Sequence, residues 1–342
     1  MTRNIYALLV GIDEYRNGVS PLTGCKNDII AVEQYLQGRF DQEQMYIRKL
    51  LNEEATRQAI IDGFRQHLCQ AGSEDVALFY FAGHGSQNEA SPEFWHIEPD
   101  RLNESILCYD SRSNPEIWDL ADKEIAKLIA EVDAKNPHIT IVMDCCHSGS
   151  GTRTSDTRRA PIDKRKRPIE SYLISTAEIE QQSTSHSSES NPSGWNFPGA
   201  RYVLLAACRD IEEAKEYTGD GKRRGAFSYF LMDALQQANG NLTYRDLFKR
   251  TQALITSNVK AQSPQLEATI QTDIEQPFLG GAIDPPTPYF TVSYHPDHSW
   301  VIDGGAIHGI VPPADTETTT LALFPFDSSP QQLTKLSDAL GE

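Results

Sequence analysis

The stretch Ile139-Thr-Ile-Val-Met-Asp-Cys-Cys-His-Ser-Gly149 decides the fold, because an apolar run stops abruptly on an acid, two thiols and an imidazole. The β-branched residues 139–142 predict a buried strand, and the Ser-Gly-Ser-Gly sequence at 148–151 predicts the loop that ends it. Open α/β sheets keep their ligand sites at the carboxyl ends of their strands. The two cysteines are therefore expected at an edge where chemistry takes place.

Further apolar runs of strand length alternate with helical patterns in the first half of the chain. Strands are predicted at 6–12, 45–51 and 76–82, and amphipathic helices at 29–36, 59–68 and 120–132. Strands that alternate with helices favour right-handed crossovers and a mostly parallel sheet flanked by helices. In such a sheet His84, just after the strand 76–82, lies at the same edge as Cys145 and Cys146.

Changes in composition divide the chain into parts. We expect four parts: residues 1–152 with the histidine and the cysteines, a basic and serine-rich mobile linker at 153–200, a part at 201–284 that completes the sheet, and a small β-rich module at 285–342. The last part has no obvious closing strand, so the sequence leaves open whether this module is complete and whether the chain is a fragment of a longer protein. The fold class is α/β with a small C-terminal β-rich module.

Charge and cysteine usage restrict the classes of function. The formal net charge of −17 argues against nucleic-acid and anionic-membrane binding and is compatible with cationic substrates. The N-terminal apolar run is too short for a secretory signal, and the six cysteines contain no CxxC pair. We therefore expect reduced thiols and a cytoplasmic location. The oligomeric state stays open, with a monomer as one option.

A thiol becomes a useful nucleophile as the thiolate, which a neighbouring imidazole can generate or stabilise. Two parallel strands that end at His84 and Cys146 bring this pair together. The N–H groups of Gly85 and Cys146 are candidate donors to a tetrahedral oxyanion. The implied chemistry is acyl transfer from a peptide bond.

Four ordered motifs, at 6–12, 24–28, 81–85 and 144–149, resemble the caspase-like cysteine peptidases, specifically the metacaspase and prokaryotic orthocaspase branch. The similarity extends over about residues 5 to 282. It implies that Cys146, which directly precedes His-Ser-Gly, is the nucleophile rather than Cys145, and that His84 is the general base. It also implies that Asp28 and Asp144 line a pocket for arginine or lysine, with Cys25 near the site, and that proteins or peptides with basic residues are the substrates.

Two positions depart from the pattern of that branch. The residue two before the histidine is often serine and here is Ala82, and the region where calcium-dependent metacaspases carry aspartates holds Arg153. Asp110, Asp119 and Asp122 carry oxygen ligands that suit a hard cation such as calcium. However, too few positions match the aspartates of the calcium-dependent metacaspases to predict a calcium site. We therefore expect calcium-independent activity without a cofactor or metal.

The basic run Arg153–Arg167 stands out in an acidic protein and is expected to be exposed and mobile. In a protease that prefers arginine or lysine, such a loop is a candidate self-processing site. The basic run is equally compatible with a solvated loop or with a docking patch for an acidic partner. The acidic residues Asp210, Glu212, Glu213 and Glu216 favour a solvated face, although one of them could flank the pocket.

The candidate site residues also have purely structural interpretations. A free cysteine is usually a small buried hydrophobe, and Asp28 suits the start of a helix. Asp144 has the stronger functional case, because a carboxylate at a buried strand end is costly without a partner. Two other functions remain as rivals: a catalytically silent caspase-like module that binds peptides, and a caspase-like protease with a different residue preference.

Overall fold

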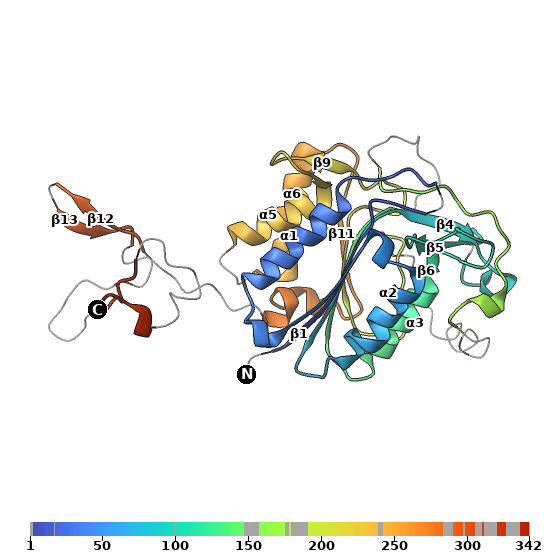
Figure 1. Ribbon diagram of the computed structural model, residues 1–342, viewed down its shortest axis with the longest axis horizontal. Helices are drawn as coiled ribbons and strands as arrows, with labels where there is room; N and C mark the ends of the chain where they lie inside the picture. Colours follow the sequence, from blue (N-terminus) through green and yellow to red (C-terminus); the bar gives the residue numbers. More distant parts are fainter. Residues whose placement is uncertain are drawn as a thin grey trace. The chain divides into compact units, whose positions relative to one another are not determined.

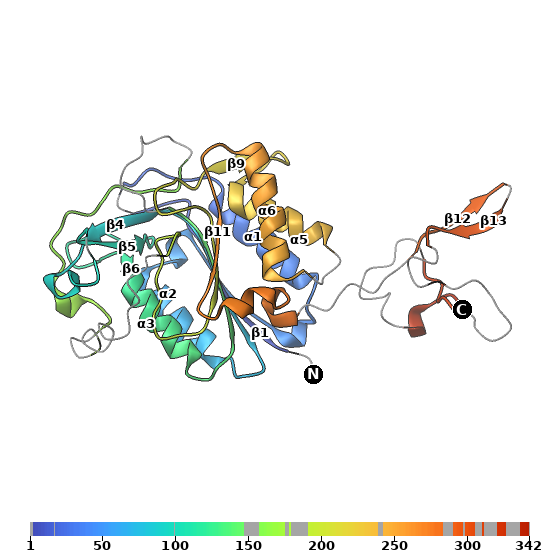
Figure 2. The ribbon, with the colours of Figure 1, turned by 180° about the vertical axis from the view of Figure 1, so that it is seen from behind.

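The computed structural model describes residues 3–16, 18–98, 100–146, 157–174, 178, 191–238, 242–282, 290–296, 298–304, 310, 320–325 and 336–341. The chain forms two compact units, Met1–Ile283 and Asp284–Glu342. Figures 1 and 2 show the chain from opposite sides. In the described parts of the chain, no helix combines the length and the apolarity that crossing a membrane requires.

A six-stranded sheet forms the centre of the first unit. Its strands are β1 (Ile5–Gly11), β2 (Met45–Leu51), β3 (Val76–Ala82), β7 (His138–Asp144), β8 (Val203–Ala206) and β11 (Gln265–Ala268). Their order is β11-β8-β7-β3-β1-β2, and every neighbouring pair is parallel except β11 with β8. The prediction of a mostly parallel α/β sheet is confirmed.

Among the described residues, five helices cover the two faces of this sheet. On one face lie α1 (Cys25–Gln37), α5 (Ala226–Gln237) and α6 (Tyr244–Asn258), and on the other lie α2 (Arg57–Gln66) and α3 (Asp122–Asp133) (Figure 1). Each face has its own hydrophobic core. Because both faces are covered, β3 is buried along its whole length, as continuous apolar strands of parallel sheets are.

The segment between β3 and β7 contains structure that its polar sequence hides. Residues 86–119 are polar and rich in residues that favour loops, but β4 (Gly85–Glu89), β5 (Leu102–Ile106) and β6 (Leu120–Ala121) form a three-stranded antiparallel sheet. The small sheet begins at Gly85, directly after His84, and so forms one wall beside that histidine.

Two further antiparallel hairpins lie in the described parts of the chain. The strands β9 (Glu216–Thr218) and β10 (Arg223–Gly225) pair just before α5. In the second unit, β12 (Val292–His295) pairs with β13 (Ser299–Ile302). This hairpin agrees with the expected small β-rich C-terminal module.

Candidate active site

The carboxyl ends of β3 and β7 bring His84 and Cys146 to one place. In the parallel pairing of these strands Ala82 lies opposite Asp144, so continuing the register by two residues sets position 84 beside position 146. Both side chains are buried, with exposed fractions of 2% for His84 and 1% for Cys146. The approach is close enough that a side chain at Gly85 would collide, because its Cβ would lie 2.3 Å from the Cys146 carbonyl oxygen.

The two adjacent cysteines belong to different faces of the sheet. Cys146 packs into the core under α1 and α5, whereas Cys145 packs into the core under α2 and α3. This division follows from the alternation of side chains along an extended chain. Burial raises the pKa of the Cys146 thiol to about 12, and a hydrogen bond with the Ala214 backbone acts in the opposite direction. The thiol is therefore protonated in this arrangement at neutral pH.

His84 is held with one ring nitrogen occupied and the other available. Nε2 lies 2.8 Å from the carbonyl oxygen of Ser20, which can only accept, so Nε2 carries the proton. Among the described residues, the buried Nδ1 has no hydrogen-bond partner. Burial lowers the pKa of His84 to about 4, which leaves the imidazole neutral at pH 7. Nδ1 therefore carries no proton, and the Arg158 backbone lies close enough to act on the His84 pKa, which it raises.

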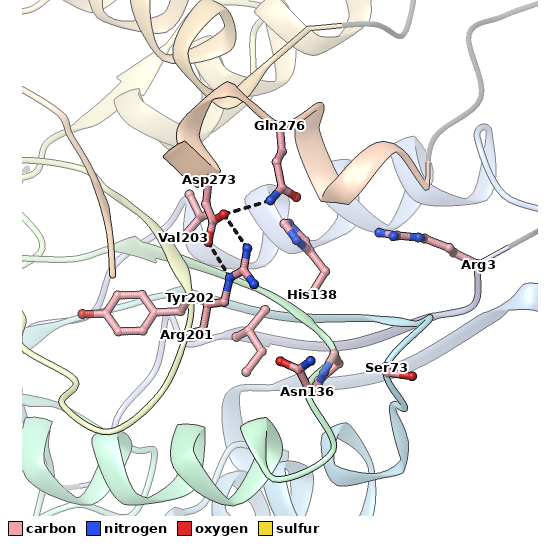
Figure 3. A pocket seen from close by; sticks show the side chains of 11 residues that line it. Arg3, Ser73, Asn136, His138, Arg201, Tyr202, Val203, Asp273 and Gln276 are labelled. Carbon is pink, nitrogen blue, oxygen red and sulfur yellow. Dashed lines mark hydrogen bonds and ion pairs between the residues drawn. The ribbon is translucent and has the colours of Figure 1, made fainter. Parts of the chain in front are cut away.

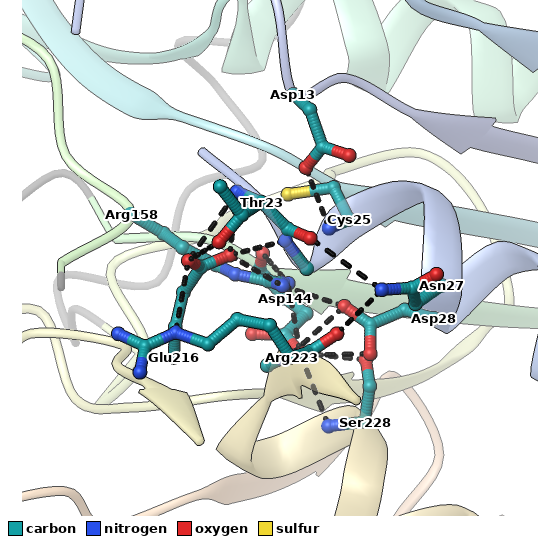
Figure 4. A network of polar contacts seen from close by, with 12 residues as sticks. Asp13, Thr23, Cys25, Asn27, Asp28, Asp144, Arg158, Glu216, Arg223 and Ser228 are labelled. Atoms are coloured by element: carbon teal, nitrogen blue, oxygen red, sulfur yellow. Dashed lines mark hydrogen bonds and ion pairs between the residues drawn. The ribbon is translucent and has the colours of Figure 1, made fainter. Parts of the chain in front are cut away.

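Asp28 and Asp144 both contact one cation of the same chain, the guanidinium of Arg158. Nη2 of Arg158 lies 2.5 Å from Oδ2 of Asp28, and Nη1 lies 3.1 Å from Oδ2 of Asp144. A third carboxylate, Glu216 in β9, lies 3.6 Å from the guanidinium. Figure 4 shows this network. The side chains of Asp28, Asp144 and Arg158 are all fully buried, so the structure forms a closed, negatively lined pocket filled by one arginine.

Neighbouring residues fix the two aspartates in place. Ser228, in the first turn of α5, donates to Oδ2 of Asp144 from its hydroxyl at 2.6 Å and from its backbone N–H at 3.1 Å. The Gly225 N–H donates to Asp28. A Cβ at Gly225 would lie 2.1 Å from Asp144 Oδ2 and 2.6 Å from Arg158 Nη1, so only glycine leaves room for the guanidinium here.

The backbone of Arg158 is held as precisely as its side chain. Its carbonyl oxygen accepts hydrogen bonds from the N–H groups of Gly85, at 3.1 Å, and Cys146, at 3.2 Å. Its own N–H donates to the Ala214 carbonyl at 2.9 Å. Thr157 forms an antiparallel bridge with Lys215 on one side, and the Ala160 N–H donates to Gly85 on the other. The segment 157–163 therefore crosses the ends of β3 and β7 with the Arg158 carbonyl beside Cys146.

Several sequence expectations can now be placed. Cys25, Asp28, His84, Gly85, Asp144 and Cys146 are gathered around Arg158, as the effect of the Arg158 charge on the buried Cys25 thiol illustrates. The expectation that the basic run is exposed is wrong for Arg158 and Arg167, which are 0% and 4% exposed, because buried carboxylates pair with both. Arg153 and residues 147–156 lie outside the described residues.

Four other participants were given no role from the sequence. Ser20 and Ala214 act through backbone carbonyl groups, which leave no motif. Gly225 and Ser228 belong to a Gly-Ala-Phe-Ser motif at 225–228 that is part of the family resemblance, but the resemblance alone did not assign their contacts with the two aspartates. Glu216 belongs to the acidic patch that was expected to be solvated, with the option that one of its residues flanks the pocket. Its side chain is only 2% exposed, so Glu216 is that residue. The three aspartates considered for a cation are engaged elsewhere: Asp119 with Arg112, Asp122 with Lys123, and Asp110 with the Arg57 N–H.

A polar pocket of about 210 Å³ lies at the opposite edge of the sheet, where β7 and β8 begin. Its lining includes Arg3, His138, Arg201, Tyr202, Asp273 and Gln276 (Figure 3). The pocket shares no lining residue with the site around Cys146. The two are separated by the length of the strands.

Comparisons with known proteins give the family. The caspase domain, Peptidase_C14, matches residues 4–275. Metacaspase-1 of Schizosaccharomyces pombe is 26% identical over 297 residues, which cover 78% of this chain and 68% of the relative. Inactive metacaspase-4 of Trypanosoma brucei brucei is 25% identical over 290 residues, with 80% and 74% covered. Because one relative is inactive by name, membership of the family does not by itself establish activity.

Solved structures add a likeness of fold. Protein GSU0716 of Geobacter sulfurreducens superposes with a TM-score of 0.53 at 19% identity, covering 81% of this chain and 98% of that protein. The order of the strands, the placement of His84 and Cys146 at neighbouring strand ends and the range matched by the caspase domain all indicate the same family. This chain belongs to the caspase-domain family of cysteine peptidases, with metacaspases among its distant relatives.

Proposed function

We propose that the protein is a cysteine endopeptidase that cuts after arginine or lysine, with Cys146 as nucleophile and His84 as general base. One observation carries the proposal. The Arg158 guanidinium lies between Asp28 and Asp144 while its carbonyl oxygen accepts from the N–H groups of Gly85 and Cys146. An arginine held by both its charge and its carbonyl is in the position of the residue before a cut bond.

The proposed reaction uses His84, Cys146 and two backbone N–H groups of the site, with water for the final hydrolysis. His84 Nδ1 takes the proton of the Cys146 thiol, and the sulfur attacks the carbonyl carbon of the substrate arginine. The resulting oxyanion is stabilised by the N–H groups of Gly85 and Cys146. The C–N bond then breaks, the protonated His84 gives its proton to the leaving amine, and water hydrolyses the thioester to free the enzyme.

The pocket explains a preference for positive charge. Burial raises the pKa of Asp28 to about 8, and the Arg158 guanidinium is the strongest influence acting against this rise. A carboxylate buried without a cation is strongly disfavoured, so the pocket gains most when a guanidinium or ammonium fills it. An acidic substrate residue would meet three carboxylates and be repelled. This argues against a preference for acidic residues.

We further propose that Arg158–Arg159 is a self-processing bond, within the basic run that the sequence singles out. Support comes from the extended course of residues 157–163 across the site. Until this bond is cut, Arg158 fills the pocket and excludes other substrates. Self-cleavage would therefore precede cleavage of other proteins.

Replacing Arg158 tests this assignment directly. In Arg158→Ala the bond to Arg159 is expected to be cut at least about 100-fold more slowly, because the buried ion pairs that hold it are lost. Arg158→Lys should retain cleavage, since an ammonium can still meet the carboxylates. The measurement is the appearance of a new N-terminus at Arg159 in purified protein, followed by intact mass.

The exposed Lys164 in the same segment supplies the matched control. Lys164→Ala should be cut as fast as the wild type. Undiminished cutting after position 158 in Arg158→Ala would contradict the proposal. A wild-type chain that stays uncut and hydrolyses no basic peptide would instead favour the catalytically silent module, an alternative that the inactive relative keeps in view.

The pKa of His84 predicts how self-cleavage depends on pH. The imidazole accepts a proton only when neutral, and burial lowers its pKa to about 4, so the self-cleavage rate should be retained above this pH and lost below it. Once residues 157–163 leave the site, His84 regains water and its pKa should return towards about 6.5. Cleavage of added peptides should therefore decline near pH 6.5, at a higher pH than self-cleavage.

The comparison uses newly translated protein transferred to buffers from pH 3.5 to 8, beside processed enzyme with an arginyl fluorogenic peptide. Circular dichroism of Cys146→Ala over the same range reports any loss of fold. Identical pH midpoints for the two reactions, in a pH range where the fold is intact, would refute the assigned role of burial.

A further inference from the structure

Arg159, the residue after the proposed cut bond, faces a carboxylate of its own. Its Nη1 lies 3.8 Å from Oε1 of Glu213, and the two side chains are only 10% and 16% exposed. The main chain at this point is fixed as well. Arg159 forms a parallel bridge with Gly85, and the Ala160 N–H donates to the Gly85 carbonyl at 2.8 Å. The backbone contacts of Arg159 and Ala160 therefore place the Arg159 side chain near Glu213.

Glu213 is anchored beside the nucleophile. It directly precedes Ala214, whose carbonyl accepts the Arg158 N–H and whose backbone also hydrogen-bonds the Cys146 thiol. The charges of Glu213 and Arg159 both act on the pKa of that thiol, Glu213 raising it and Arg159 lowering it. The carboxylate therefore belongs to the site itself, on the side where the leaving part of the substrate lies.

The carboxylate also has unused bonding capacity. Within the described residues, Oε1 of Glu213 is buried and accepts no hydrogen bond. A buried carboxylate oxygen without a donor is costly, and a basic side chain that approaches about 1 Å closer would satisfy it. A neutral residue at this place would leave it unsatisfied, and an acidic residue would be repelled.

We propose that Glu213 is a specificity-determining residue that selects arginine or lysine immediately after the cut bond, so that the site prefers paired basic residues. This inference rests on the proposed function and deepens it. Asp28 and Asp144 bind the basic residue before the bond, and Glu213 binds the one after it. Arg158–Arg159 is the pair of this kind that the chain itself presents to the site.

Internally quenched peptides test the preference, because they keep residues on both sides of the bond. Four peptides based on residues 157–163 would carry Arg, Lys, Ala or Glu after the arginine at position 158. Because Arg or Lys at the next position is itself a possible cut site, each kcat/KM is taken for the bond after position 158 alone, identified by the masses of the products. For this bond, processed wild-type enzyme should show a kcat/KM about 5- to 10-fold higher for Arg or Lys than for Ala, as expected for a partly buried ion pair. Glu at this position should be the poorest.

Variants of Glu213 convert this preference into a residue assignment. In Glu213→Gln the ratio of Arg to Ala should fall to within about twofold of unity, and in Glu213→Lys the peptide with Glu should become the best of the four. Each ratio is taken within one enzyme, so a change in overall activity does not affect it. Glu212→Gln is the matched control, because the Glu212 carboxylate instead accepts from Ser263, and its ratio should stay at the wild-type value.

A charge exchange in the uncut chain provides a second reading. Arg159→Glu should slow self-cleavage about 10-fold, and adding Glu213→Lys should restore it to within about threefold of the wild type. Equal cleavage of all four peptides by wild-type enzyme, or no rescue by the exchange, overturns the inference while the proposed function stands. Failure of wild-type enzyme to cut any of the peptides and of the chain to cut itself overturns both.

Discussion

Cys146→Ala is expected to abolish self-cleavage and peptide hydrolysis, a loss of at least about 10⁴-fold, because the sulfur that attacks the carbonyl is removed. The chain should remain a single species, whereas the wild type yields fragments that end at Arg158 and begin at Arg159. Intact mass and N-terminal sequencing distinguish these outcomes. The variant should also keep Arg158 in its pocket, since none of the ion pairs of Arg158 involves the thiol.

The neighbouring cysteine is a strict control for this experiment. Cys145→Ala removes the same atom one residue earlier, but in the core on the opposite face of the sheet. It should retain cleavage at the same bond. Loss of cleavage in both variants would indicate damage to the strand end, and persistence of cleavage in Cys146→Ala would exclude Cys146 as nucleophile.

Asp144→Asn is expected to have the next largest effect, lengthening the half-time of self-cleavage about 100- to 1000-fold. The substitution leaves the Arg158 guanidinium buried beside an amide, and breaking a buried ion pair costs about 3–5 kcal/mol. Asp28→Asn should act in the same direction, because Asp28 makes the shorter contact with Arg158. An arginyl fluorogenic peptide gives the second measurement.

Asp273→Asn is the matched control, because Asp273 is 3% exposed and pairs with Arg201 at the far edge of the sheet. It should self-cleave at the wild-type rate if it folds. A comparable loss in Asp273→Asn would assign the effect to folding. An unchanged half-time of self-cleavage in Asp144→Asn would show that Asp144 does not contribute to binding the arginine.

The central strands of the sheet were predictable because β1 and β3 are nearly uninterrupted apolar runs, whereas the outer strands β2 and β11 contain charged residues. Buried strands such as β3 need no polar alternation, so their sequences stand out, and their parallel arrangement follows from the helices between them. The small sheet of β4, β5 and β6 was missed for the opposite reason. Gly85–Glu89 and Leu102–Ile106 contain Ser, Gln, Asn and Glu, which favour loops, and only pairing partners distant in sequence make them strands.

The site was predictable to the extent that motifs mark it. His84, Cys146, Asp28 and Asp144 follow strands or begin a helix, where their positions can be inferred from the sequence. Arg158 could not be placed in the same way, since a charged residue in a basic run is normally solvated. Its burial depends on Asp28, 130 positions earlier in the chain, and on Glu216, which belongs to a patch that looks like an ordinary surface.

The parallel pairing of β7 with β8 has a consequence for a chain cut between Arg158 and Arg159. The cut lies between these two strands in sequence, so one polypeptide would contribute four strands of the sheet and the other would contribute β8 and β11. The pieces would share both hydrophobic cores and behave as a heterodimer made from a single gene product. Its melting temperature would then depend on protein concentration, which is not the case for the intact chain.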